Sequence, residues 1–138
     1  MWFLSAVLAL LAFAGMQLSF KRLASGGLST PTLLLLVFAL STVFLAIHAA
    51  ASRSSLAVDA KLYKFVLIAA VLSYLGNLFM VRAIADAPNP GYAMGVIGAQ
   101  AVVVTIGAIV LFGSEFSLVK GFGIALTVIG AALLGFER

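Results

Sequence analysis

The sequence predicts an all-α integral membrane protein with five transmembrane helices. Its 138 residues are 64% hydrophobic and only 9% charged, whereas a soluble domain typically carries about 25% charged residues. The mean hydropathy is +1.27, and a chain this short could not cover so apolar a composition with polar side chains. We therefore expect the lipid bilayer to be its solvent and residues 1–138 to form a single five-helix transmembrane domain.

Charged and turn-forming residues divide the chain into five apolar blocks, each long enough to cross the ~30 Å hydrocarbon layer as a helix. Because lipid offers no partner for backbone amides, such blocks must be helical. The first block precedes Lys21 and Arg22, unlike a signal peptide, in which the positive charge comes first. The predicted spans are Trp2–Phe20, Thr32–Ala51, Phe65–Ala85, Tyr92–Gly113 and Leu118–Phe136.

Local signals mark where two of these helices begin. Pro31 opens the second span, with Ser29 or Thr30 as its N-cap, because proline suits the first turn and small hydroxyl side chains cap free amides. Asn89 and Pro90 have the same roles before the fourth span, in the stretch DAPNPGYAMGVIGAQ. The prolines on either side of Asn89 bias the chain out of the helical region and end the third span.

The positive charges give the chain no preferred orientation in the membrane. Without a Lys and Arg excess on one side, we expect insertion both ways and an antiparallel homodimer. The alternative is that the charges nearest the helix ends weigh more and restore a bias. No basic run exists to bind nucleic acid. Arg53, Lys61, Lys64 and Lys120 fall on one side, and Lys21, Arg22, Arg82 and Arg138 on the other.

Residues for catalysis or metal binding do not come together in the sequence. The chain has no cysteine and one histidine, and its four acidic residues fall in linkers or at the terminus. Neither a metal ligand set nor a nucleophile with its base can be assembled from these residues. We expect a protein that is not an enzyme and that holds no metal and no cofactor.

Glycines recur at helical spacing in the last two spans. Gly91, Gly95 and Gly98 share one face of the fourth span, and no Lys-Ser/Thr follows them, which argues against a phosphate-binding loop. Small residues on one face let another helix approach closely. We predict that they pack helices, together with Gly123 and Gly130 of the fifth span; close approach of a solute to the bare backbone is the alternative.

Polar residues inside the spans are the candidates for a solute pocket. They cost free energy in lipid unless they are paired, so they tend to face a bundle interior or a wet cavity. For each of them the alternative is an interhelical hydrogen bond worth about 1 kcal/mol. The predicted pocket residues are Gln17, Tyr74, Asn77, Tyr92 and Gln100.

Three stretches carry a resemblance to a known family. They are GMQLSFKRLASGGLSTP, YLGNLFMVRAIADAPNPGYAMGVIGAQ and LFGSEFSLVKGFGIALTVIGAALLGF. Their order resembles one repeat of the drug/metabolite transporter superfamily, the EamA-type domain, over essentially the whole chain. The resemblance implies half of a transporter, because the family usually fuses two such repeats of opposite orientation around a site at the membrane midplane.

The chain departs from the family pattern at three places. One is Ser114, which separates Gly113 from Glu115, where the family tends to have the glycine and the glutamate adjacent. The family's fourth helix commonly carries a proline near its middle, where this chain has Ala99 and Gln100. The related small multidrug resistance proteins use a first-helix glutamate for proton exchange; that place falls near Phe13, and the first span holds no carboxylate. We therefore expect uniport or gradient-driven exchange in place of proton-coupled antiport.

The sequence as a whole predicts a carrier for a small organic solute, such as a metabolite, an amino acid or a drug-like compound. We expect it to work by alternating access in a bacterial plasma (inner) membrane, paired with itself or with a homologous half. Two alternatives stay open. One is a non-transporting assembly or accessory subunit, and the other is a component of a flippase for lipid-linked substrates.

Overall fold

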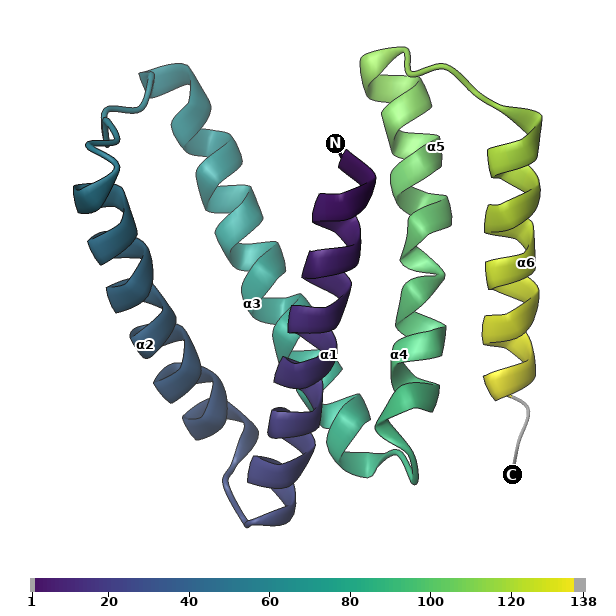
Figure 1. Ribbon diagram of the computed structural model, residues 1–138, viewed down its shortest axis with the longest axis horizontal. Helices are drawn as coiled ribbons and strands as arrows, with labels where there is room; N and C mark the ends of the chain where they lie inside the picture. The colour runs from purple at the N-terminus through teal and green to yellow at the C-terminus, as the bar shows by residue number, and fades with distance from the viewer. Residues whose placement is uncertain (1, 136–138) are drawn as a thin grey trace. The chain divides into compact units, whose positions relative to one another are not determined.

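Five helical spans make up the part of the protein that the structure describes. The computed structural model describes residues 2–135, which contain five helices long and apolar enough to cross a membrane. This confirms the predicted fold class and makes the chain a multi-span membrane protein. The helices are α1 (Trp2–Ser25), α2 (Thr30–Ala51), α3 (Tyr63–Asp86, preceded by the 3-10 turn Ala60–Leu62), α4 (Pro90–Gly98), α5 (Gln100–Phe112) and α6 (Leu118–Gly135) (Figure 1).

The first helix is longer than the sequence predicts. It continues through Lys21 and Arg22 to Ser25, because its end is set by a glycine and not by the charges. Gly27 has φ +91°, a conformation that only glycine adopts without strain. Its amide bonds to the Ala24 carbonyl at 3.0 Å, and the Leu28 amide bonds to the Leu23 carbonyl at 3.2 Å. These two bonds form a Schellman motif.

The predicted helix starts are confirmed. Ser29 is the N-cap of α2, and its Oγ accepts a hydrogen bond from the Thr32 amide at 3.4 Å. Asn89 is the N-cap of α4, where its Oδ1 accepts from the Gly91 amide at 2.8 Å. In both helices a proline stands in the first turn, where its missing N–H costs no hydrogen bond.

The fourth span is interrupted at Ala99, which the sequence does not predict. The span Pro90–Phe112 is long enough to cross, but α4 ends at Gly98 and α5 begins at Gln100. Across the break the Ala99 amide bonds to the Val96 carbonyl at 3.1 Å, and the Val102 amide to the Ala99 carbonyl at 3.0 Å. These are the tighter bonds of a 3-10 turn. Glycine is a weak helix former, and Gly98 lies directly before the break.

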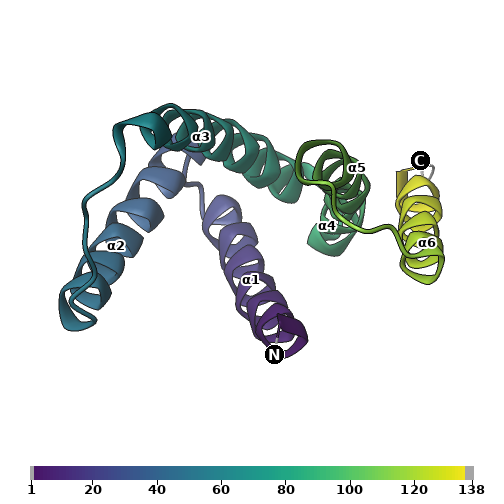
Figure 2. The same cartoon turned by 90° about the horizontal axis from the view of Figure 1, so that it is seen from above.

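The helices group into two compact units, Met1–Ala85 and Asp86–Arg138, called here the α1–α3 unit and the α4–α6 unit. In the α1–α3 unit, α1 and α2 leave their shared turn and diverge (Figures 1 and 2). The core of this unit lies where α1 ends, α2 begins and α3 ends. It consists of Phe20, Leu33, Leu34 and Val81. The single domain predicted for residues 1–138 stays a prediction.

A lysine ties α1 to α3 at the same end of the unit. Lys21 Nζ donates a hydrogen bond of 2.8 Å to the carbonyl oxygen of Ala85. A cation at the C-terminus of a helix also complements the helix dipole. The first and third helices are therefore held together at one end by packing and by a charge-assisted hydrogen bond.

The α4–α6 unit is packed along its helices. α4 has its most extensive contacts with α6, and α5 has fewer with that helix. Ala131 of α6 is buried. The contact is close because small residues leave the helix backbones free to approach each other.

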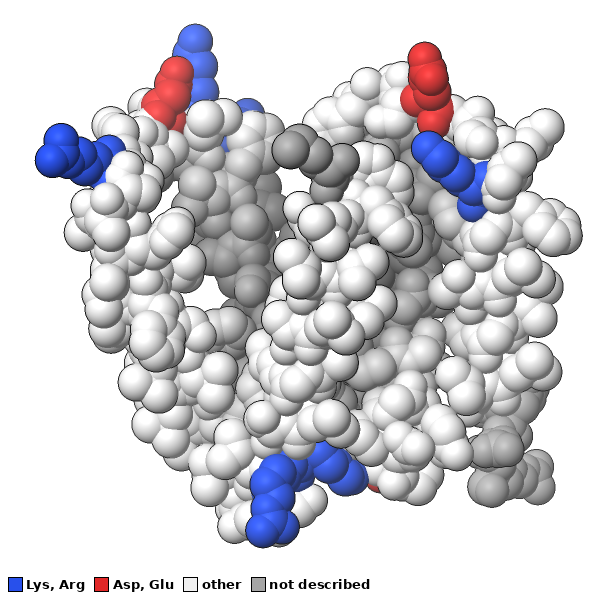
Figure 3. All heavy atoms as spheres, in the orientation of Figure 1, with Lys and Arg blue, Asp and Glu red and all other residues white. Residues whose placement is uncertain are grey.

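Most of the surface between the helix ends is apolar. At most 11% of the residues in any span are buried inside the chain, and Figure 3 shows the Lys, Arg, Asp and Glu side chains at the helix ends with an uncharged surface between them. Such a surface matches a hydrocarbon layer flanked by water. The chain is therefore an integral membrane protein that contacts the lipid bilayer.

Candidate functional site

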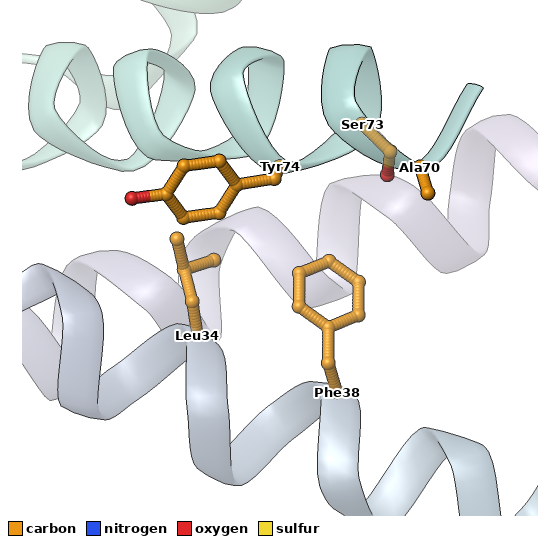
Figure 4. A pocket seen from close by; sticks show the side chains of 5 residues that line it. All are labelled: Leu34, Phe38, Ala70, Ser73 and Tyr74. Carbon is orange, nitrogen blue, oxygen red and sulfur yellow. The ribbon is translucent and has the colours of Figure 1, made fainter. Parts of the chain in front are cut away.

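A groove between α2 and α3 brings aromatic and hydroxyl side chains together inside the α1–α3 unit. It has two adjoining parts, of about 290 and 380 Å3. Leu34, Phe38 and Tyr74 line both parts, and Figure 4 shows the Phe38 and Tyr74 side chains extending from the two helices into the space between them. The remaining lining residues are Pro31, Leu35, Ala39, Thr42, Ala70 and Ser73.

Helical spacing explains why these side chains share the groove. On α2, Leu34, Phe38 and Thr42 follow one another at intervals of four residues, which places them on one face. On α3, Ser73 and Tyr74 lie in the middle of the helix, far from the charged residues at its two ends. The groove is therefore built by two helices whose facing stripes are apolar except for three hydroxyl groups.

Two of the three hydroxyl-bearing residues, Thr42 and Ser73, form hydrogen bonds within their own helix. Thr42 Oγ1 donates to the Phe38 carbonyl at 2.8 Å. Asn77 Nδ2 donates to the Ser73 carbonyl at 2.8 Å and lies 3.4 Å from Ser73 Oγ. Within residues 2–135 no hydrogen bond involves the hydroxyl of Tyr74, whose side chain is 61% exposed. Tyr74 therefore offers a free polar group in an apolar groove.

The groove carries no formal charge, since none of its lining residues is Lys, Arg, His, Asp or Glu. Inside a membrane span the effective dielectric is low, so a charge without a partner would be costly there. Across the described part of the chain, no three His, Asp or Glu residues gather where they could hold a metal ion. The groove is equipped for apolar contact and hydrogen bonding.

The structure brings one of the five predicted pocket residues into this groove. Tyr74 lines it, and Asn77 lies one turn further along α3 but uses its amide within that helix. Gln17 is half-buried in α1. Tyr92, in the first turn of α4, and Gln100, the first residue of α5, belong to the α4–α6 unit. The assignment of all five residues to a solute pocket stays a prediction.

Sequence reasoning missed the α2 side of the groove. This side belongs to the most apolar span of the chain, in which the sequence predicts no pocket residue. The span includes Leu34, Phe38 and Thr42. The sequence signal that could have indicated the groove is the spacing of four residues between the aromatic Phe38 and the hydroxyl-bearing Thr42. Aliphatic and aromatic residues at this spacing usually mark a packed helix face, so the sequence alone does not separate a groove wall from a core.

The glycines predicted to pack helices have different surroundings. A methyl group at Gly95 would overlap the side chain of Leu134 in α6, so α4 and α6 are close at this point. At Gly91 it would meet only the Asn89 side chain, which caps the same helix. Among the described residues, nothing lies within 4 Å of a Cβ built on Gly98, Gly123 or Gly130.

No family model, curated protein or solved structure matches this chain. The resemblance to the EamA-type domain therefore rests on the quoted residues.

Proposed function

We propose that the chain carries a small organic solute across a bacterial plasma (inner) membrane by alternating access, as an EamA-type half-transporter. The observation that carries the proposal is the α2–α3 groove, which holds the free hydroxyl of Tyr74 inside a membrane span. Polar groups inside a membrane span cost free energy and are typical of substrate pathways. Concave, largely apolar sites with a few polar groups are also the usual form of a small-molecule site.

A second copy of the chain completes the transporter in this proposal. Carriers of this general plan place their site between two repeats of opposite orientation, and one five-helix unit supplies a single repeat. Four Lys and Arg fall on each side of the predicted spans, so either orientation is open to the chain. We propose an antiparallel homodimer; a homologous half of fixed opposite orientation is the other partner that this plan allows.

Counterflow in proteoliposomes tests transport by screening classes of solute in turn. Liposomes that contain the purified chain are loaded with one unlabelled solute at a time, from amino acids, nucleosides, sugars and neutral aromatic compounds, and uptake of the labelled form is followed. We expect one class to exchange faster than in empty liposomes. Tyr74→Ala should reduce this exchange by about 10-fold, whereas Tyr63→Ala, at an exposed tyrosine outside the groove, should not.

The outcome of the counterflow experiment separates transport from assembly. Exchange no faster than in empty liposomes for every solute class, by a chain that remains helical, would contradict transport and favour an accessory subunit. Asn77→Ala and Gln100→Ala extend the experiment to predicted pocket residues outside the groove. We expect both to lower solute exchange without changing the size of the purified complex, and unchanged exchange would assign these residues to helix packing.

Thiol labelling tests the antiparallel arrangement. The chain has no cysteine, so Ser55→Cys places a single thiol in the polar linker between α2 and α3. In sealed vesicles, an impermeant maleimide added outside should label about half of the chains, and the rest should react only after the vesicles are opened. Complete labelling or none from outside would mean one fixed orientation and would contradict the homodimer.

A further inference from the structure

The lining of the α2–α3 groove restricts the kind of solute that could lie in it. Its two parts, of about 290 and 380 Å3, are at the lower end of the roughly 300–1,000 Å3 that small-molecule sites occupy. Two aromatic rings, Phe38 and Tyr74, extend into the space from opposite helices (Figure 4). Aromatic rings attract other rings through stacked and edge-to-face contacts as well as through their area.

The polar groups of the groove favour a solute with a hydrogen-bond acceptor. Thr42 Oγ1 donates to its own helix, and the Ser73 carbonyl already accepts from Asn77. Ser73 Oγ accepts a hydrogen bond from Asn77 Nδ2 at 3.4 Å, so the Tyr74 hydroxyl is the lining hydroxyl that has no hydrogen-bond partner among residues 2–135. A hydroxyl group without a partner is costly in an apolar medium, so a solute that accepts a hydrogen bond from the Tyr74 hydroxyl would stabilise the occupied state.

Charge is the property that the groove excludes. No lining residue carries a formal charge. The acidic residue of the α1–α3 unit, Asp59, lies in the linker between α2 and α3. An anion or a cation would enter a low-dielectric space without a counter-ion. Aromatic rings can attract a cation, but here no carboxylate supports them.

We infer that the α2–α3 groove binds an uncharged, planar aromatic solute, whose ring lies against Phe38 and Tyr74 and which has an acceptor for the Tyr74 hydroxyl. The inference rests on the proposed function, since it names the substrate class for the same site. It goes beyond that function because a carrier of charged metabolites would need a different lining. Acyl chains of the surrounding lipid are the competing occupant of any apolar groove in a membrane.

Three probes with the same ring and different charge test the inference: 3-formylindole, which is neutral and has a carbonyl acceptor, tryptamine, a cation, and indole-3-propionate, an anion. Binding of each is measured by equilibrium dialysis on the full chain in phosphatidylcholine nanodiscs, with empty nanodiscs as the reference for partition into lipid. We expect 3-formylindole to bind at least about 10-fold more tightly than either charged probe.

Matched variants locate the binding. Phe38→Ala should weaken binding of 3-formylindole by about 10-fold, and Tyr74→Phe, which removes only the hydroxyl, by about 5-fold. Phe44→Ala on α2 and Tyr63→Phe on α3 are the controls, because both side chains are exposed and lie outside the groove; neither should change binding. Tyr74→Phe keeps the ring, so its effect does not depend on misfolding.

Three results would overturn the inference. They are tighter binding of tryptamine or indole-3-propionate than of 3-formylindole, no binding of 3-formylindole above empty nanodiscs, and equal losses in the control variants. Each can be told apart from failure of the proposed function. Counterflow of a charged solute would uphold transport while refuting the neutral class, and binding of 3-formylindole without counterflow of any solute would refute transport alone.

Discussion

The α1–α3 unit and the α4–α6 unit are made of helices of similar hydropathy, but they are packed in different ways. In the α1–α3 unit large side chains, such as Phe20 and Leu33, meet at one end of the helices. In the α4–α6 unit α4 packs closely against α6, where Gly95 faces Leu134. One unit is joined at an end, and the other is joined along a helix pair.

The difference has a physical cause in the solvent. Lipid tails are as apolar as leucine, so helices in a bilayer gain little from hiding apolar surface and associate through close packing and hydrogen bonds. Glycine and alanine supply close packing in the α4–α6 unit. In the α1–α3 unit the large buried residues lie at one end of the helices, and α2 and α3 have between them the groove lined by Phe38 and Tyr74.

The largest effect is expected where α4 and α6 are closest. Gly95→Leu would place a bulky side chain against Leu134 and should lower the free energy of unfolding by about 3 kcal/mol, as overpacking does. The measurement is helical circular dichroism during titration of the detergent-solubilised chain with dodecyl sulfate. Gly98→Leu is the control, since the space beside Gly98 is open. Equal losses in both variants would show that close packing at Gly95 does not stabilise the unit.

The next largest loss of unfolding free energy is expected from a change in the core of the α1–α3 unit. Phe20 is 1% exposed, whereas Phe13 on the same helix is 56% exposed. Phe20→Ala leaves a cavity, which should cost about 2 kcal/mol at roughly 24 cal/mol per Å3, and Phe13→Ala should cost little. Dodecyl sulfate titration of both variants checks the difference. If Phe13→Ala is as damaging as Phe20→Ala, the unit is not held at one end.

A smaller effect is expected from the lysine between α1 and α3. Lys21→Met removes the hydrogen bond to the Ala85 carbonyl and should cost about 1.5 kcal/mol, the lower end for a bond to a charged group. The neighbouring Arg22→Met removes an exposed cation and serves as the control in the same titration. A free energy of unfolding that is unchanged by Lys21→Met would show that this hydrogen bond does not stabilise the contact between α1 and α3.

The smallest effects should be alike in the two units. Ser29→Ala and Asn89→Ala each remove an N-cap hydrogen bond and should cost about 1 kcal/mol. The caps act locally, so similar losses of unfolding free energy in the two variants would mean that the units differ in helix packing and not in their helix ends. A loss confined to one variant would show that the caps also differ.

The sequence predicts what is set locally in this protein. The five spans follow from the length of the apolar runs, and the caps at Ser29 and Asn89 follow from residue type and the adjacent prolines. The α2 wall of the groove is not predicted, because it depends on how two helices meet. The break at Ala99 is not predicted either, because a glycine such as Gly98 weakens a helix without fixing where it is interrupted. Gly95 and Gly98 illustrate the limit: they share the pattern, yet only Gly95 has a neighbouring helix against it.

The central claim is that the α2–α3 groove opens to each side of the membrane in turn. Ser73→Cys places a thiol in the groove of a chain that has no cysteine, and Ser55→Cys places one in the linker as the reference. With an impermeant reagent outside sealed vesicles, linker labelling should stop at about half in a dual-topology population. Alternating access predicts that the groove thiol reacts to completion under the same conditions. Groove labelling that stops at the same fraction as linker labelling, or that does not occur, would contradict the account.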